Sequence, residues 1–288
     1  AVPVRNSSGQ SNNMRARLTM KILCLVISFA APATAQQKTT GLRGMEAEND
    51  ALVWQSVGRL DAKGSGFCTA TLIAPELVLT AAHCVYDSKS GKLYTPDSLT
   101  FRAGLRNGEA AAARAVSQIE AHPAYKPGRG IGIENIRHDV ALLRLETPIP
   151  TTELDPFVLH NSIVSSGPVS VVSYGRRREN LPSRQDVCQV EATREGVMFM
   201  DCDVTFGSSG SPVFSHKNGR GQIVSVISGM ANIQGRKVAL GMTLPAVVAQ
   251  LRHQMWANKQ KPVAQVNRIR VGSGGAGSSA AGAKFVRP

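Results

Sequence analysis

Short runs of alternating apolar and polar residues occupy most of the chain between Trp54 and Thr243. Many of the apolar positions are β-branched, and an alternation with period two is typical of strands that bury one face. Turn-forming clusters such as 61–66, 126–130 and 217–221 separate the runs. The pattern predicts strands over Val53–Leu60, Phe67–Ile73, Leu77–Thr80, Leu99–Ala103, Ala115–Ala121, Val140–Leu145, Val169–Tyr174, Val187–Ala192, Val197–Asp201, Gln222–Ser228 and Val238–Thr243.

Many short strands without intervening helices predict an all-β sandwich or barrel. A Pro-rich bridge at Thr147–Pro156 divides the strands into two similar groups, which favours two β-barrels joined by a linker. The clearest helical pattern comes near the end, at Ala246–Trp256, where Val247, Leu251 and Met255 recur at a helical spacing. Pro245 precedes it, as a first helical position allows.

The positive charge lies mainly at the two ends of the chain. The 288 residues carry a formal charge of +13, which by itself suggests a partner of negative charge such as nucleic acid. Residues 1–35 contribute +4 and residues 259–288 contribute +6, whereas 36–258 contribute only +3. The nearly neutral central region therefore argues against binding a polyanion as the main function. With 42% hydrophobic residues the chain can form a substantial core, and it has no apolar run long enough for a polytopic membrane protein.

The first end has the pattern of a secretory signal peptide over residues 14–35. A basic segment ending at Lys21 precedes ten mostly apolar residues, 22–31, and Ala33 and Ala35 provide the small-residue cleavage pattern. We expect cleavage after Ala35, and we treat residues 1–13 as upstream sequence. A buried N-terminal helix is the weaker alternative. Four cysteines then remain in an exported protein, secreted or periplasmic, where disulfides persist.

The other end, residues 259–288, has no periodicity. Twelve of the thirteen residues from Val271 to Ala283 are Gly, Ser or Ala, which offer little side chain to bury. We interpret it as a flexible basic tail in solvent. Weak contact with an anionic surface is the alternative hypothesis.

Three segments carry the residues needed for nucleophilic acyl transfer. They are TAAHC at Thr80–Cys84, HDVALLRL at His138–Leu145, and GSSGSP at Gly207–Pro212. A hydroxyl needs an imidazole to accept its proton, and a carboxylate orients that imidazole and stabilises its positive charge. Each segment alone is more simply explained as structural. Their occurrence together, in the order His, Asp, Ser within an exported all-β chain, is typical of one known triad arrangement.

On these three motifs the chain, over about residues 51–256, resembles the trypsin-like (chymotrypsin-fold) serine proteases, and most of all their bacterial secreted branch, which includes glutamyl endopeptidases. The resemblance implies two six-stranded antiparallel β-barrels with a C-terminal helix, and no cofactor or metal. It implies that His83 is the general base, Asp139 its orienting acid and Ser209 the nucleophile. The backbone N–H groups of Gly207 and Ser209 would form the oxyanion hole, and Ser228 would line the substrate cleft.

The same resemblance implies the disulfide pairing. Cys68 and Cys84 lie where the family has a bridge beside the histidine, which leaves Cys188 to pair with Cys202 across a predicted hairpin. A metal site made by these cysteines is disfavoured, because the chain has neither a C-x-x-C motif nor a nearby pair of histidines.

The sequence departs from the family at two places. Animal trypsin-like zymogens free an Ile or Val N-terminus that pairs with an Asp directly before the nucleophile, but that position is Ser208 here and 39–50 contains no such start. Activation by that pair is therefore not supported. Specificity is also ambiguous: Asp203 would favour Lys or Arg substrates, whereas Met230 would favour small side chains. Asp203 is more simply explained as a turn or hydrogen-bonding residue.

We therefore expect a secreted serine endopeptidase that acts on protein or peptide substrates, without a nucleic-acid partner and without a transmembrane segment. The alternatives are a catalytically silent binding protein on the same fold, and a basic protein that binds polyanions or a cell surface.

Overall fold

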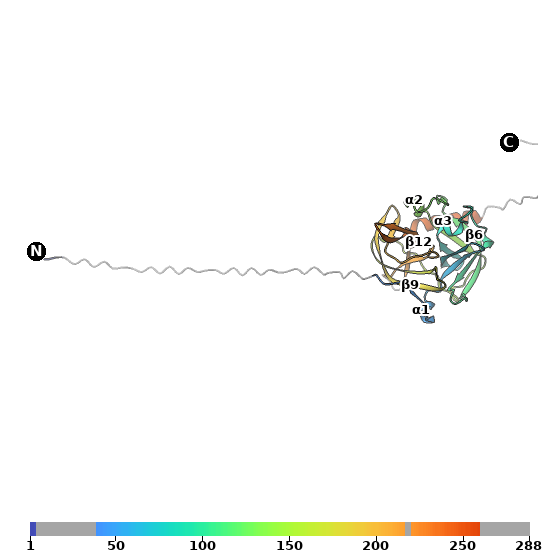
Figure 1. The fold of residues 1–288 in the computed structure, drawn as a ribbon, viewed down its shortest axis with the longest axis horizontal. Coiled ribbons are helices and arrows are strands. Elements are labelled where there is room, and N and C mark those ends of the chain that lie inside the picture. The colour runs from blue at the N-terminus through green and yellow to red at the C-terminus, as the bar shows by residue number, and fades with distance from the viewer. Residues whose placement is uncertain (4–38, 217–219, 260–288) are drawn as a thin grey trace, which may run out of the picture. The chain divides into compact units, whose positions relative to one another are not determined.

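Two closed antiparallel β-barrels form the body of the protein, with the helix α3 (Pro245–Lys259) at the end (Figure 1). The structure is a computed structural model that describes residues 1–3, 39–216 and 220–259. The predicted signal peptide and nearly all of the predicted tail lie outside the described residues. Within the described part of the chain, no helix combines the length and the apolar character needed to span a membrane.

The first barrel has the strand order β2-β3-β4-β7-β6-β5 and lies entirely before the Pro-rich bridge. Its walls alternate as a half-buried strand should: in β5 the residues Leu99, Phe101 and Ala103 point inward and are fully buried. Its strands are β2 (Val57–Ala62), β3 (Gly66–Ala74), β4 (Leu77–Thr80), β5 (Leu99–Ala103), β6 (Ala112–Ala121) and β7 (Ala141–Leu145).

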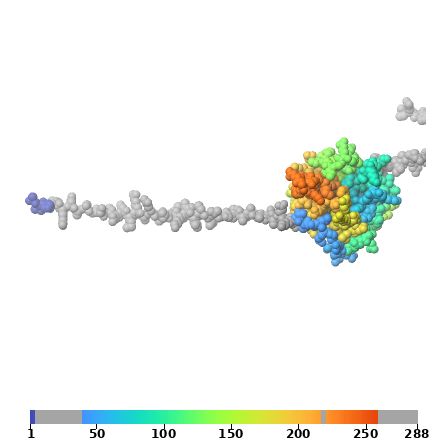
Figure 2. Space-filling view, viewed as in Figure 1, coloured from blue at the N-terminus to red at the C-terminus, as the bar shows by residue number. Residues whose placement is uncertain are grey.

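The second barrel follows the bridge and closes through the pairing of β8 with β9. The order around it is β9-β10-β13-β12-β11-β8, and the short strand β1 (Arg43–Gly44) adds to β9. The blue residues that begin the described body lie against the yellow residues of β9 in Figure 2. Its strands are β8 (Gly167–Gly175), β9 (Arg178–Arg194), β10 (Val197–Met200), β11 (Pro212–Ser215), β12 (Gln222–Ile233) and β13 (Arg236–Thr243).

Short helices occupy the connections between strands. They are α1 (Glu48–Leu52), α2 (Ile133–Ile136), and the 3-10 turns η1 (Ala82–Val85) and η2 (Pro96–Ser98). The predicted strand over Val53–Leu60 was wrong in its first half, because the apolar residues Leu52 and Val53 belong to the exposed end of α1 and β2 begins only at Val57.

The remaining predicted elements are confirmed, β4 and β5 with the predicted ends and the others with shifted ends. The C-terminal helix runs to Lys259, and the residues of it that are fully buried are Val248, Leu251 and Met255, whereas Val247 is only partly buried. The strand β9 extends from Arg178 and is much longer than the predicted Val187–Ala192. The sequence pattern therefore predicted the architecture, with errors at element boundaries, and it missed the short strands β1 and β11 and the short helices α1 and α2.

Candidate active site

His83 and Asp139 lie together because they occupy neighbouring strand ends. The strand β4 pairs antiparallel with β7, so that Thr80 at the end of β4 faces Ala141 at the start of β7. His83 comes three residues after Thr80, in the turn η1, and Asp139 comes two residues before Ala141. The TAAHC and HDVALLRL motifs are thus one structural unit at one end of the first barrel.

Two hydrogen bonds join the histidine to the aspartate. The Nδ1 atom of His83 lies 2.7 Å from Asp139 Oδ2, and the backbone N–H of His83 donates to Asp139 Oδ1 over 2.8 Å. The Asp139 side chain is only 4% exposed, whereas that of His83 is 32% exposed. A carboxylate can only accept, so Nδ1 carries the proton, and the lone pair of the neutral ring lies on Nε2. This is the tautomer that a general base needs.

The pKa of His83 is raised above its usual value. Burial acts in the opposite direction and favours the neutral ring, but the negative charge of Asp139 and the hydrogen bond to it outweigh burial. Asp139 thus stabilises the imidazolium that forms when His83 accepts a proton.

Ser228 contributes a third hydrogen bond to the same aspartate. Its Oγ donates to Asp139 Oδ2 over 2.5 Å from β12 of the second barrel. The sequence predicted only that Ser228 lines the cleft; the contact with Asp139 was missed, since no motif connects residues 89 positions apart. Ser228 therefore joins the second barrel to the buried acid.

The loop that carries Ser209 is held by both barrels. The backbone N–H of Thr69 in β3 donates to the carbonyl oxygen of Ser209 over 2.8 Å, and Thr69 Oγ1 donates to that of Gly207 over 2.9 Å. From β12, the carbonyl oxygen of Ile227 accepts the N–H of Gly210 over 2.8 Å. These bonds place the GSSGSP turn between the first barrel and the strand that carries Ser228.

The two glycines of this loop are required by its conformation. Gly207 has φ +92° and Gly210 has φ +80°, in the region that favours glycine. A Cβ on Gly210 would lie 2.1 Å from the carbonyl oxygen of Thr69, and one on Gly207 would lie 2.4 Å from the ring of Phe67. The loop approaches the first barrel this closely only because neither residue has a side chain.

The amide groups of the loop alternate between bonded and free. Ser208 N–H donates to Thr205 over 2.9 Å, whereas the N–H groups of Gly207 and Ser209 have no acceptor among the described residues. Ser209 Oγ likewise makes no hydrogen bond to a described residue, His83 included. Contacts between a nucleophile and its base often tighten only when substrate binds.

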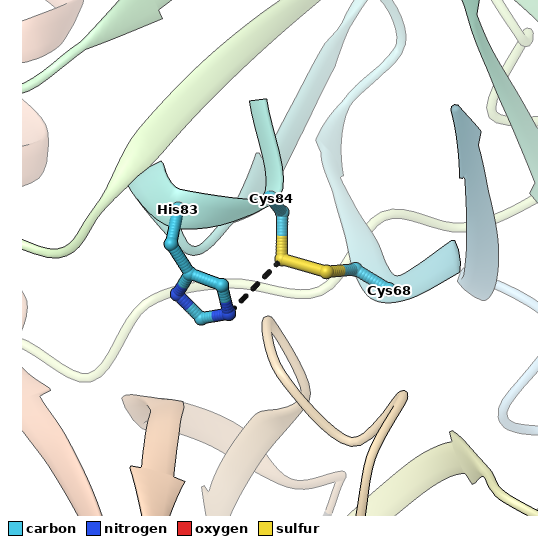
Figure 3. Close-up of side chains that lie close together, drawn as sticks. All are labelled: Cys68, His83 and Cys84. Atoms are coloured by element: carbon cyan, nitrogen blue, oxygen red, sulfur yellow. Dashed lines mark hydrogen bonds between the residues drawn. A yellow bond between two sulfur atoms is a disulfide. The ribbon is translucent and has the colours of Figure 1, made fainter. Parts of the chain in front are cut away.

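A disulfide links β3, which contacts the Ser209 loop through Thr69, to the turn that carries His83. Cys68, next to Thr69, is bonded to Cys84, and Cys84 Sγ lies 3.7 Å from Nε2 of His83 (Figure 3). A disulfide sulfur has no proton to donate, so it leaves the lone pair of Nε2 available. The second disulfide joins Cys188 to Cys202, as the sequence resemblance implied.

Among the residues that the structure describes, two groups have the composition of metal sites. Cys68, His83 and Cys84 form one, and Cys188, Asp201 and Cys202 form the other. In both groups each cysteine belongs to a disulfide, which lacks the thiolate that metals bind. Neither group fits a metal ion in this state.

The two remaining predicted residues stand apart from the histidine. Asp203 is exposed, and its backbone N–H donates to Gln185 Oε1 over 2.7 Å. Met230 is half-buried in β12, opposite Ala239. No described contact links either residue with His83 or Ser209.

Comparison with known proteins shows the family of the chain. Residues 64–224, more than half of the chain, match the family described as trypsin-like peptidase domain. The chain belongs to the trypsin-like serine protease family. The matched residues of this trypsin-like domain include His83, Asp139 and Ser209, and they span both barrels.

Individual relatives match part of the chain. The chain is 33% identical to kallikrein-15 of Saguinus oedipus over 152 residues, which is 52% of this chain and 54% of that protein. It is 34% identical to serine protease SP24D of Anopheles gambiae over 118 residues, 40% of each chain. The chain thus spans about half the length of the curated relatives it matches, or less.

Solved structures share the fold at lower sequence identity. A structure titled as Glu endopeptidase in complex with MPD aligns with a TM-score of 0.62 at 20% identity, covering 76% of this chain and 97% of that one. A thermostable serine protease, AL20, aligns with a TM-score of 0.57 at 19% identity, covering 71% and 99%. At these identities the likeness supports the two-barrel fold alone.

Proposed function

We propose that this protein is a secreted serine endopeptidase that hydrolyses peptide bonds through Ser209, His83 and Asp139. The observation that carries the proposal is the pairing of His83 Nδ1 with the buried carboxylate of Asp139. The Cys68–Cys84 disulfide connects the turn of His83 to β3, where the backbone N–H of Thr69 donates to the carbonyl oxygen of Ser209. Family membership supports the reaction class, and the geometry supports the roles.

The reaction proceeds in two stages. Ser209 Oγ attacks the carbonyl carbon of the scissile bond while Nε2 of His83 accepts its proton, and the resulting imidazolium is stabilised by Asp139. The imidazolium then donates the proton to the departing amine, which leaves an acyl-enzyme. Water attacks that ester with His83 again as base, the bond between the acyl carbon and Ser209 Oγ breaks to release the carboxylic acid, and His83 returns the proton to Ser209 Oγ.

The loop that carries Ser209 stabilises the oxyanion that forms from the scissile carbonyl group. When the carbonyl carbon becomes tetrahedral, its oxygen carries a negative charge that needs preorganised donors. The free N–H groups of Gly207 and Ser209 are suited to this task, because their neighbours Ser208 and Gly210 have already used theirs. Ser228 acts as a support of Asp139 in this scheme, and Asp203 and Met230 stay candidates for substrate binding.

Secretion completes the proposal. Residues 14–35 have the pattern of a signal peptide. The two disulfides are stable in an oxidising compartment, which is either the extracellular medium or the periplasm. The substrate is a protein or peptide, and the reaction needs no cofactor. Contact of the basic tail with an anionic surface is a secondary hypothesis.

Labelling with a fluorophosphonate probe tests the nucleophile directly. We expect wild-type protein to be labelled and to cleave members of a diverse peptide library, and Ser209→Ala to lose both properties. Ser211→Ala is the matched control, since Ser211 is a buried serine of the same loop whose Oγ has no partner among the described residues. A wild-type protein that is folded, unlabelled and inactive would support a silent binding protein instead.

A further inference from the structure

A partly buried guanidinium lies beneath the nucleophile loop. Arg178, the first residue of β9, donates from Nη1 to the carbonyl oxygen of Ser173 over 2.6 Å. From Nη2 it donates to Ser173 Oγ over 3.0 Å and to Ser208 Oγ over 3.2 Å. All of these acceptors are neutral, and no carboxylate of the described residues forms a hydrogen bond or ion pair with this arginine.

Arg178 nevertheless remains a cation at neutral pH. Burial lowers its pKa to about 10, and the negative charges of Asp203 and Glu179 limit the decrease. A partly buried cation that has only neutral acceptors is costly unless those acceptors are well oriented. The energetic cost of partly burying this charge indicates that the hydrogen bonds of the charged guanidinium have a role that a neutral side chain would not fill.

Ser208 is the residue through which Arg178 reaches the loop. It is fully buried, and besides the arginine its Oγ accepts the backbone N–H of Thr205 over 3.2 Å. The hydroxyl also lies 3.4 Å from both Ser173 Oγ and the carbonyl oxygen of Tyr174. The backbone of Ser208 stands between the two free N–H groups, those of Gly207 and Ser209.

The guanidinium is closely packed in its place. A Cβ on Gly175 would lie 2.7 Å from Arg178 Nη2 and 2.7 Å from Thr205 Cγ2. The arginine therefore fills the space between the end of β8 and the start of the nucleophile loop. A shift of β8 or of the start of the loop would move Arg178, and through it Ser208 and the adjacent N–H groups of Gly207 and Ser209.

We infer that Arg178 is a positioning residue for the oxyanion loop, acting through the hydroxyl of Ser208. The inference rests on the proposed function. Animal zymogens of the family create a cation at a new N-terminus, and it pairs with an acid directly before the nucleophile. In this chain the cation is Arg178 of the β8–β9 hairpin, and the residue directly before Ser209 is Ser208, which accepts its hydrogen bond. The loop is then ordered without a cleavage that frees a terminal ammonium group.

Replacing Arg178 by Gln, with Arg177→Gln as the matched control, tests this role. Arg177 is the exposed neighbour on the same hairpin, so the control removes the same charge without touching Ser208. We expect kcat of Arg178→Gln to fall about 10- to 100-fold, as for the loss of part of an oxyanion hole, with little change in KM. The acid limb of the pH profile should stay in place, because His83 and Asp139 are untouched. Equal kcat values for the two variants would overturn the inference.

Chemical rescue separates positioning from general support of the fold. In Arg178→Ala, millimolar guanidinium chloride should restore part of kcat, whereas sodium chloride at the same ionic strength should not. Ser208→Ala, which keeps the arginine, should lower kcat in the same direction and resist rescue. A loss of kcat in Arg178→Ala that guanidinium does not reverse, with melting temperature unchanged, counts against the inference.

Hydrogen exchange provides a readout that does not depend on activity. Amides of residues 203–211 should exchange faster in Arg178→Gln than in Arg177→Gln, and Arg178→Lys, which retains a cation, should be intermediate. If wild-type protein neither labels nor cleaves, the proposed function fails, and the exchange comparison still decides the inference. Unchanged exchange in 203–211 would refute the positioning role even in an active enzyme.

Discussion

The two barrels differ in how far the polar groups of their site residues are already hydrogen-bonded. In the first, His83 and Asp139 already satisfy each other through two hydrogen bonds, on adjacent strand ends. In the second, the groups proposed to meet the substrate, Ser209 Oγ and the N–H groups of Gly207 and Ser209, have no partner among the described residues. The acid–base half of the site is assembled by its own charges, whereas the nucleophile half is held by backbone contacts.

This difference suggests how each half fails. The first half depends on an electrostatic pair in a buried position, so a change of charge should damage it without unfolding the barrel. The second half depends on geometry, so its weak points are the glycines, the strand contacts and the disulfide that orient it. The predictions below test this contrast, from the largest expected effect to the smallest.

Removing the charge of Asp139 should have the largest effect. Asp139→Asn keeps the shape but cannot hold the proton on Nδ1 as firmly or stabilise the imidazolium, so kcat should fall by about 10⁴-fold. Steady-state cleavage of the best peptide of the library measures this fall in kcat. The control is Asp97→Asn, which neutralises an exposed acid of η2, directly before β5 of the same barrel. A loss below about tenfold in Asp139→Asn would contradict the assignment of the acid.

The disulfides allow a direct comparison between barrels. They close loops of 16 and 14 residues, so replacing either pair by alanine should lower the free energy of unfolding by a similar amount, about 3 kcal/mol. Only the Cys68→Ala/Cys84→Ala variant should also lose kcat at a temperature where both variants are folded. Chemical denaturation and peptide cleavage measured on the same samples test this prediction. Equal losses of kcat would show that the Cys68–Cys84 bridge has no special link to the site.

Ser228 offers a smaller perturbation of the same acid. Ser228→Ala removes one hydrogen bond to the charged Asp139, which should reduce kcat/KM by about tenfold. Ser225→Ala is the control, since Ser225 lies on the same strand and its Oγ donates to the carbonyl oxygen of Met242 instead. An unchanged kcat/KM in Ser228→Ala would mean that Asp139 needs no support from the second barrel.

The pH dependence should show the smallest effect. Protonated His83 cannot accept a proton, so kcat/KM should decrease as pH falls through the pKa of His83. Because the pKa of His83 is raised, the midpoint should lie above the ordinary histidine value of about 6.5. In the residual activity of Asp139→Asn the midpoint should move to lower pH. A wild-type midpoint below that of the variant would reverse the proposed role of the charge.

Sequence patterns predicted the parts of this molecule that depend on local chemistry. The motifs around His83, Asp139 and Ser209 are short, and alternating strands such as β5 show their buried face within five residues. These features therefore appear in the sequence without knowledge of distant contacts. The Pro-rich bridge likewise marked the division between the two barrels.

Features that depend on long-range contacts escaped prediction. The polar first half of β9, from Arg178 onwards, has no alternating apolar face and becomes a strand by pairing with β8 and β1. The apolar Val53 was predicted to begin a strand, although it is exposed and caps the end of α1. The bond between Arg178 and Ser208 joins residues 30 positions apart, and no motif contains both.

The segment that enters the second barrel has a consequence for maturation. The N–H of Thr40 donates to the carbonyl oxygen of Val187 over 2.8 Å, Gln185 Nε2 donates to the carbonyl oxygen of Thr40 over 2.7 Å, and Met45 is buried in the core. These contacts are made by internal peptide groups and side chains, none of them by a terminal amine. On the proposal that residues 14–35 are a signal peptide, mature forms that differ by a few residues before Thr39 should therefore share one specific activity. Heterogeneous N-termini would then be compatible with a homogeneous enzyme.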